Sequence, residues 1–402
     1  MTITPGGELV LTVGPAGHGG FCVARHEGRV VFVRHALPGE RVRAVVTEDR
    51  GGSYCRADAV EVLDPAPGRV LPPCPASGPG GCGGCDFQHV DPAVQRGLKA
   101  AVVAEAMRRI AGLEVAVTVE ELPGGPLGWR TRTRLAVDGA GYAGFRVHRS
   151  HAVLPVSDCP LTAPGVLAPV LDRRWRPGGE LEVVADDAGV LHVAEVRPGR
   201  PPSWIRGSGR AVQQAAGRRW EISAAGFWQV HPGAAAALTA IVGEWSAASD
   251  GATGWDLYGG VGLFASVLAG QVGRAGSVTV VESSRRAVAD GSRALSDLPQ
   301  VRFVRARVER ALAERALTEL AGQPEVVVLD PPRRGAGRQV ANAVARRGPG
   351  RIVHIGCDPA ALARDVAAYL DAGYRLVMLR ALDAFPMTHH IECVALLKPG
   401  GS

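Results

Sequence analysis

The feature that most constrains the fold is a regular alternation of apolar strands and helices between residues 219 and 402. Each strand is short and almost continuously apolar, which is typical of strands buried on both faces of a sheet. The strand segments are TGWDLYG, SVTVVES, VRFVRA, PEVVVLDPP, RIVHIG, YRLVMLRALDAF and ECVALLKP. Because helices connect most of these strands, the pattern predicts a doubly wound, Rossmann-like parallel sheet.

The rest of the chain has a different pattern and predicts a multi-domain α/β protein. Residues 1–63 alternate short apolar runs with glycine-rich turns, which indicates a small OB-like β-barrel. Residues 64–218 begin with a Pro/Gly-rich linker and are expected to form a β-rich central domain. Within them, residues 91–113 have apolar positions at helical spacing, with Asp91 as a cap and Pro92 in the first turn. We expect this helix to pack on the C-terminal domain.

Composition narrows the class of protein. The chain has 402 residues, of which 46% are hydrophobic, and its net charge of +6 permits a polyanionic partner. No apolar run is long enough to span a bilayer, and the N-terminus lacks a signal-peptide pattern. We therefore expect a cytoplasmic monomer with no membrane association. In that compartment the eight cysteines are interpreted as metal ligands or catalytic groups before disulfides.

A glycine-rich turn follows the first strand of the C-terminal domain. The strand ends at Asp256 and Tyr258, the turn WDLYGGVG opens a helix, and the next strand ends at Glu282. Glycines let the backbone approach a ligand closely, and an acidic residue at the second strand can bind both ribose hydroxyls. The pattern fits adenosine cofactors in general, and a tight structural turn is the alternative.

A further strand ends in LDPPRRG, which places Asp330 at the carboxyl edge of the sheet. The two prolines force an extended path and remove two backbone donors. Methyltransferases that act on amino groups carry an aromatic residue where this chain has Arg333. If the chain transfers a methyl group, Arg333 therefore argues against an exocyclic amine as the group that accepts it.

Two residues near the C-terminus are candidates for catalysis. Cys357 lies between a strand and a helix, where a helix N-terminus can polarise a thiol toward thiolate. Glu392 lies at the start of the last strand, on the same face as His390, where a raised pKa would suit a general base. The alternatives are a buried packing cysteine and a surface glutamate. Cys393 points to the opposite face and is interpreted as a core residue.

These segments together resemble the bacterial RNA uridine-5-methyltransferases, which carry an N-terminal TRAM barrel and, in some members, an iron–sulfur cluster. The motifs are FWQVHP, DLYGGVG, LDPPRRG, GCDPAALARD and HHIEC, and the resemblance covers nearly all of the chain. It implies that the cofactor is S-adenosylmethionine, bound by Gln229, Tyr258, Leu263, Glu282 and Asp330. Two positions depart from the family: Leu263 replaces a usual asparagine, which leaves a backbone contact, and VRARVER has basic or apolar residues where an acidic or amide residue is usual.

The resemblance also assigns four cysteines as ligands of a structural [4Fe–4S] cluster: Cys74, Cys82, Cys85 and Cys159. The gap of seven residues between the first two is longer than usual in the family. A CxxC pair with two distant cysteines could equally bind zinc, which is the alternative. Cys22 and Cys55 lie in the barrel segment and are interpreted as packing residues.

The implied reaction is methylation of C5 of a uridine in rRNA or tRNA. Cys357 would attack C6 of the base, and Glu392 would remove the C5 proton. The TRAM barrel and the arginines of WRTRTR (Arg130, Arg132 and Arg134) are candidate RNA-binding surfaces, with a solvated strand face as the alternative.

Three other functions are weighed against this one. A radical tRNA-modifying enzyme with a TRAM barrel would need a CxxxCxxC motif, which the chain lacks. A non-catalytic RNA-binding protein would have no need of both Cys357 and Glu392. A cytosine-5 methyltransferase would carry its nucleophile in a different sequence context.

Overall fold

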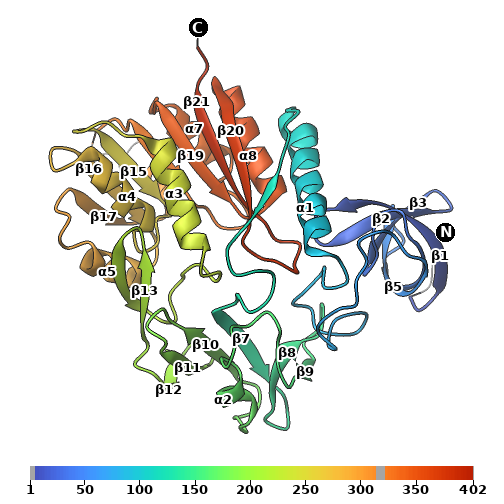
Figure 1. The fold of residues 1–402 in the computed structure, drawn as a ribbon. Helices are drawn as coiled ribbons and strands as arrows, with labels where there is room; N and C mark the ends of the chain where they lie inside the picture. Colours follow the sequence, from blue (N-terminus) through green and yellow to red (C-terminus); the bar gives the residue numbers. More distant parts are fainter. Residues whose placement is uncertain (1–4, 314–321, 402) are drawn as a thin grey trace.

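The computed structural model describes residues 5–313 and 322–401 (Figure 1). This part of the chain contains a closed barrel, a six-stranded sheet, a two-stranded hairpin and an eight-stranded sheet. In Figure 1 the barrel lies at the right, the six-stranded sheet at the bottom and the eight-stranded sheet at the top. No helix in the described ranges is both long and apolar enough to cross a membrane.

The N-terminal segment forms a closed β-barrel, as the sequence predicts, and the barrel has five strands. They are β1 (Glu8–Gly17), β2 (Phe21–His26), β3 (Arg29–Arg34), β4 (Arg41–Asp49) and β5 (Tyr54–Asp64). The strands close in the order β1-β2-β3-β5-β4. Alternate residues of β1 point inward, because successive side chains of a strand face opposite sides. Cys22 and Cys55 lie buried in the barrel core.

The central sheet follows the cysteine-rich linker. Its strands are β7 (Arg132–Val137), β8 (Ala143–Arg146), β9 (Val153–Pro155), β10 (Glu180–Ala185), β11 (Leu191–Val196) and β12 (Ser203–Arg206), with α2 (Ala168–Leu171) packed beside them. Their order is β12-β11-β10-β7-β8-β9. A separate hairpin, β13 (Arg210–Ala215) and β14 (Arg218–Ser223), spans the domain boundary expected at residues 218–219. Asp290 of the C-terminal domain holds this hairpin by accepting from the backbone of Ser223 and pairing with Arg210.

The C-terminal sheet has the order β17-β16-β15-β18-β19-β21-β20-β6. Its strands are β15 (Thr253–Leu257), β16 (Ser277–Glu282), β17 (Val301–Arg305), β18 (Val326–Leu329), β19 (Arg351–Gly356), β20 (Tyr374–Asp383), β21 (Glu392–Pro399) and β6 (Val119–Glu121). Strands β15 to β19 are parallel, whereas β21 runs antiparallel between β19 and β20. The start of β21 therefore lies beside the end of β19.

Helices cover both faces of this sheet. They are α3 (Ala234–Ser246), α4 (Leu263–Val272), α5 (Arg285–Ala294), α6 (Val308–Ala311), α7 (Arg338–Ala345) and α8 (Pro359–Asp371). One hydrophobic core joins the sheet to α7 and α8, and a second core joins its other face to α3 and α4. Burial on both faces explains why the strand segments are apolar throughout.

Helix α1 (Pro92–Ala106) links the N-terminal part of the chain to this sheet and ends in a π-helical turn at Met107–Ala111. Asp91 caps the helix by accepting from two backbone amides, as the sequence predicts. The buried Lys99 Nζ lies 2.6 Å from Asp383 Oδ1 and also donates to the Phe385 carbonyl. These contacts fix the loop that leads into β21.

Candidate active site

A cavity of about 1070 Å³ opens at the carboxyl ends of β15, β16, β18 and β19. This is the edge at which doubly wound sheets bind ligands, because the loops after the parallel strands converge there. All seven residues that the sequence places in the cofactor site and the catalytic pair line this cavity: Gln229, Tyr258, Leu263, Glu282, Asp330, Cys357 and Glu392. The cavity has two distinct ends, which differ in how their polar groups are held.

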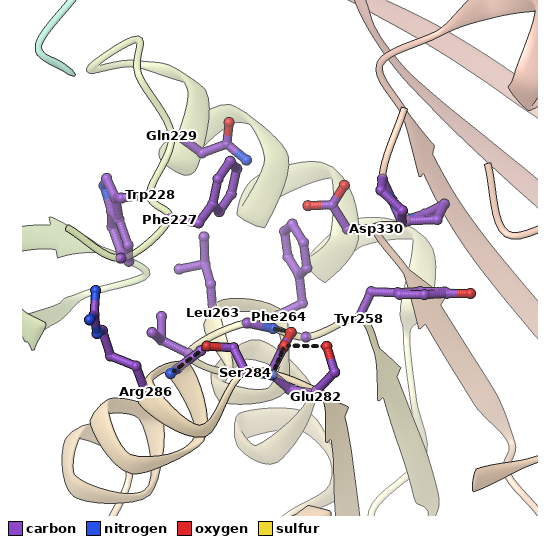
Figure 2. Close-up of a pocket in the computed structure, with 18 of the residues that line it drawn as sticks. Phe227, Trp228, Gln229, Tyr258, Leu263, Phe264, Glu282, Ser284, Arg286 and Asp330 are labelled. Carbon is purple, nitrogen blue, oxygen red and sulfur yellow. Dashed lines mark hydrogen bonds between the residues drawn. The ribbon is translucent and has the colours of Figure 1, made fainter. Parts of the chain in front are cut away.

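At one end the glycine-rich turn and Glu282 form a rigid unit (Figure 2). The backbone amides of Gly260 and Ser284 donate to the two carboxylate oxygens of Glu282, at 3.1 and 2.5 Å. A Cβ on Gly259 would lie 2.6 Å from the Val280 side chain, so a larger residue would displace the turn. This carboxylate is therefore fixed before any ligand arrives.

Asp256 stabilises the same turn through a hydrogen bond to the helix that follows it. It is fully buried and accepts from the Ala265 amide in the first turn of α4, at 2.9 Å. Burial raises its pKa to about 8. Its second carboxylate oxygen is buried with no partner among the described residues. We interpret Asp256 as a structural residue that anchors α4 beneath the turn.

The side chains around this end differ in what they offer the cavity. Figure 2 shows the ring of Tyr258 directed away from Leu263 and Phe227, and this ring packs against the core around α7 and α8. Tyr258 adopts a φ of 60°, a left-handed conformation that directs the backbone into the glycine turn. Gln229 is largely buried, whereas the neighbouring Phe227 is 72% exposed at the cavity wall.

At the other end, three neighbouring strands bring together Asp330, Cys357 and Glu392. Asp330 directly follows β18, Cys357 directly follows β19, and Glu392 begins β21. Gly356 pairs with Cys393 across the antiparallel ladder, so the residues on either side of this pair meet at the sheet edge. Glu392 is 4% exposed, and Cys393 lies fully buried in the core.

Burial dominates the electrostatics of this end. It raises the pKa of Asp330 and, together with the negative charge of Asp330, raises the pKa of Glu392 well above its usual range. Burial and the charges of Glu392 and Asp330 also raise the pKa of the Cys357 thiol to about 12. Desolvation and two adjacent carboxyl groups thus oppose the polarisation toward thiolate that a helix N-terminus can provide.

Arg333 and His390 complete the wall beside the thiol. The Arg333 guanidinium is the cation that acts to lower the pKa of Cys357, and its Nη2 lies 3.4 Å from His390 Nε2. Burial, His389 and Arg333 lower the pKa of His390 to about 3. His390 is therefore neutral near pH 7, and Arg333 is the positive group at this end.

The arginines of WRTRTR divide between structural and surface roles. Arg132 is mostly buried and donates to the carbonyls of Ala224 and Gly226. It therefore shapes the loop that carries Gln229, and the interpretation of Arg132 as an RNA contact is corrected. Arg134 is half exposed beside Glu180 and Glu182.

The four linker and central-domain cysteines line one small cavity. Its wall contains Cys74, Cys82, Cys85, Gln88 and Cys159, and its volume is about 20 Å³. Gln88 Nε2 lies 3.1 Å from the Cys85 sulfur, and burial raises the pKa of three of the thiols. Within the described residues, no three His, Cys, Asp or Glu side chains are arranged as ligands of one metal ion. The chain thus gathers the four sulfurs without bringing them to a common centre.

Several residues of the cofactor cavity were missed at the level of sequence. Glu309 lies on the wall after β17 and pairs with Arg334 at 3.4 Å. It belongs to the segment VRARVER. Most residues of this segment are basic or apolar, so the sequence pattern did not single out the glutamate. Ser284 and Arg286 also line the cavity, at the start of α5. Their only sequence signal is that they follow the second strand of the sheet.

Comparison with known proteins identifies the class. A model of tRNA (uracil-5-)-methyltransferases matches residues 231–399, and a TRAM domain model matches residues 4–60. A Streptomyces avermitilis protein named as an RNA methyltransferase is 43% identical, over 98% of this chain and 99% of that protein. The 23S rRNA (uracil(1939)-C(5))-methyltransferase RlmD of Alkalilimnicola ehrlichii is 34% identical, over 95% of this chain and 94% of that enzyme.

A solved structure supports the same fold over almost the whole chain. The tRNA (uracil-54, C5)-methyltransferase of Pyrococcus abyssi, solved with S-adenosyl-L-homocysteine, matches with a TM-score of 0.71 and 22% identity. The match covers 96% of this chain and 99% of that enzyme. The chain belongs to the family of S-adenosylmethionine-dependent RNA (uracil-5-)-methyltransferases.

Proposed function

We propose that this protein methylates C5 of a uridine in RNA through a covalent bond between Cys357 and C6 of the base. The observation that carries this proposal is that Cys357 and Glu392 share a wall of the cofactor cavity. A nucleophile and a buried carboxyl at one reaction centre are the two groups that the chemistry requires. The family to which the chain belongs supplies the acceptor class.

The cofactor residues fit S-adenosylmethionine. Glu282 presents a carboxylate fixed by two backbone amides, which suits the ribose hydroxyls, and the glycine turn leaves room for a close ligand. Gln229, Asp330 and the backbone at Tyr258 and Leu263 would hold the remainder. When bound, the cofactor supplies an electrophilic methyl group.

The chain's own residues would carry the other steps. Cys357 loses its proton to solvent, and the sulfur bonds to C6 as the C5–C6 double bond opens, which places electron density on C5 of the uracil. After C5 has gained the methyl group, the Glu392 carboxylate removes the C5 proton. The electron pair of that C–H bond re-forms the C5–C6 double bond and expels the Cys357 sulfur. A carboxyl with a raised pKa is the stronger base for this step.

Arg333 gives the thiol a route to its reactive form. Because the pKa of Cys357 is about 12, only a small fraction is thiolate near pH 7. The positive charge of Arg333 opposes that effect. The uracil must also leave its stack to reach Cys357 and Glu392 in the cavity, because a stacked base cannot present C6 to a side chain.

We also propose that Cys74, Cys82, Cys85 and Cys159 hold a [4Fe–4S] cluster. The donor set is all thiol, which suits iron–sulfur or zinc binding, and the four residues share one cavity wall. Binding requires their side chains to rotate toward one centre. Protein purified without oxygen should contain iron and sulfide in equal amounts and should show an absorption band at roughly 400 nm. Cys85→Ser should lose the absorption and Cys357→Ser should keep it, whereas zinc without iron would overturn the proposal.

The test of the main proposal uses the purified full-length protein with radiolabelled S-adenosylmethionine. Transcripts of rRNA and tRNA are offered separately, and the nucleosides are separated after digestion. We expect label in 5-methyluridine from one of the two RNAs. Label in 5-methylcytidine, or no label in any nucleoside, would contradict the proposed function.

A further inference from the structure

The turn between β1 and β2 of the barrel reaches the loop that carries the candidate nucleophile. His18 Nε2 lies 3.0 Å from Asp358 Oδ2. Asp358 directly follows Cys357 and caps α8, because its Oδ1 accepts from the Ala361 amide at 2.8 Å. One carboxylate is therefore shared between the catalytic domain's own helix and a residue of the barrel.

The same turn packs against the support of the loop that leads to Glu392. Gly20 has a φ of +80°, and a Cβ there would lie 2.6 Å from the Asp86 side chain. Asp86 Oδ2 in turn lies 2.6 Å from His389 Nδ1 and accepts from the His389 backbone at 3.1 Å. The rings of His18 and His389 meet edge to face, with centroids 6.3 Å apart. The turn thus touches the supports of both catalytic loops.

We propose that His18 is a positioning residue, which acts through Asp358 to fix the Cys357 loop against Glu392. This inference rests on the proposed function, in which Cys357 is the nucleophile. In this proposal the barrel, although it is a separate domain, helps to position the nucleophile. Without His18, Asp358 keeps its cap on α8 but loses its second anchor, so the cysteine loop gains freedom relative to the base.

The charges around His18 favour the contact. The hydrogen bond to Asp358 raises the pKa of His18, while Arg364 acts to lower it. Burial acts to raise the pKa of Asp358, but the bonds from His18 and the Ala361 amide outweigh it and hold that pKa at about 2. The charged form of the pair is therefore present above the pKa of Asp358, which is about 2, and is lost as pH rises through the raised pKa of His18.

The variants separate positioning from RNA binding and from folding. His18→Ala removes the contact, and His18→Gln keeps a neutral donor of similar reach. Asp358→Asn retains a side-chain oxygen for the α8 cap but removes the anionic partner of His18. His26→Ala, at the far end of β2, is the matched control for loss of a barrel histidine. Each full-length variant is assayed for single-turnover methyl transfer at saturating RNA and cofactor, and for alkylation of Cys357 by iodoacetamide.

We expect His18→Ala to lower the single-turnover rate on the order of tenfold and to speed alkylation of Cys357, with Cys393 still protected. His18→Gln should restore most of the rate, and His26→Ala should match the wild type. The double variant His18→Ala/Asp358→Asn should be no slower than either single variant, because the two substitutions remove the same contact.

Two results would overturn the inference. The first, which requires that the wild type is active, is a His18→Ala variant whose single-turnover rate equals that of the wild type and whose only change is a raised KM for RNA. The other is an unchanged alkylation rate of Cys357, which can be measured without RNA. Failure of the wild type to methylate any RNA would instead overturn the proposed function, and the alkylation assay would still report on His18.

Discussion

The two ends of the cavity are built on opposite principles. At the cofactor end, both oxygens of Glu282 accept backbone hydrogen bonds, so the carboxylate is held in one orientation. At the reaction end, Asp330 is half-buried and Glu392 is buried, and in the described part of the chain neither side chain accepts a hydrogen bond. Desolvation therefore raises the pKa of both carboxyl groups.

The difference teaches that only one end is complete before its ligand arrives. The cofactor end is preorganised, which reduces the ordering cost of binding. The charge state of the reaction end depends on what enters the cavity, because two desolvated carboxyl groups and a thiol of pKa about 12 lie close together there. A substitution at the cofactor end should therefore change affinity, and one at the reaction end should change chemistry.

The largest effect is expected for Cys357→Ala. Methyl transfer should fall by roughly 10⁴-fold or more, as for loss of a nucleophile in other enzymes. Calorimetry should show unchanged affinity for S-adenosylmethionine, because the thiol acts on the RNA base. Cys393→Ala, in which a buried neighbour is truncated, serves as the control and should retain substantial activity. Full activity in Cys357→Ala would remove the distinction between the two ends.

A smaller effect, at the opposite end, is expected for Glu282→Ala. Loss of a charged acceptor costs about 1.5–3 kcal/mol, which is a weakening of cofactor binding by about ten- to 150-fold. The cofactor affinity of Glu282→Gln should lie between those of Glu282→Ala and the wild type, because the oxygen of the glutamine amide can still accept from the Gly260 backbone. The rate at saturating cofactor should change little. A large fall in that rate with unchanged affinity would reverse the assignment of the two ends.

The smallest effect concerns the pH dependence of Cys357 reactivity in the protein without RNA. Since burial and two carboxyls raise the pKa of the thiol to about 12, the alkylation rate should rise about tenfold per pH unit between pH 7 and 10. Glu392→Gln should speed alkylation severalfold once the pH exceeds the raised pKa of Glu392, because the negative charge of the glutamate is then absent from the variant. Arg333→Ala should slow it. A plateau below pH 8 in the wild type would show that the thiol is not destabilised as an anion.

The sequence was sufficient to place the residues at the ends of individual strands. Glu282 ends one parallel strand, Asp330 and Cys357 directly follow two others, and the carboxyl ends of such strands meet at one edge. The position of Glu392 beside Cys357 depends on β21 running antiparallel between β19 and β20. That arrangement is a property of the whole sheet, and the apolar pattern of the last two strands does not encode it.

Contacts between distant segments could not be predicted in the same way. Arg132 lies in an alternating strand pattern that suggests exposure, yet it is buried against residues about 90 positions away. His18 lies in a glycine-rich barrel turn that gives no sign of its distant partner Asp358. The pKa of Cys357 depends on its own desolvation and on the charges of Glu392 and Asp330. The local sequence shows that a helix follows Cys357, but it does not show which carboxyl groups the fold brings near.

The most direct measurement of the central claim uses Glu392→Gln with S-adenosylmethionine and the RNA that the wild type methylates. The nucleophile is intact in this variant, so the sulfur can bond to C6 and C5 can gain its methyl group. The C5 proton then lacks its base, and release should slow by about 10²–10⁴-fold. We predict a protein–RNA adduct that survives denaturing electrophoresis, requires the cofactor and is absent when Cys357 is also replaced by Ala. Normal turnover without an adduct, or an adduct that forms without Cys357, would contradict the account.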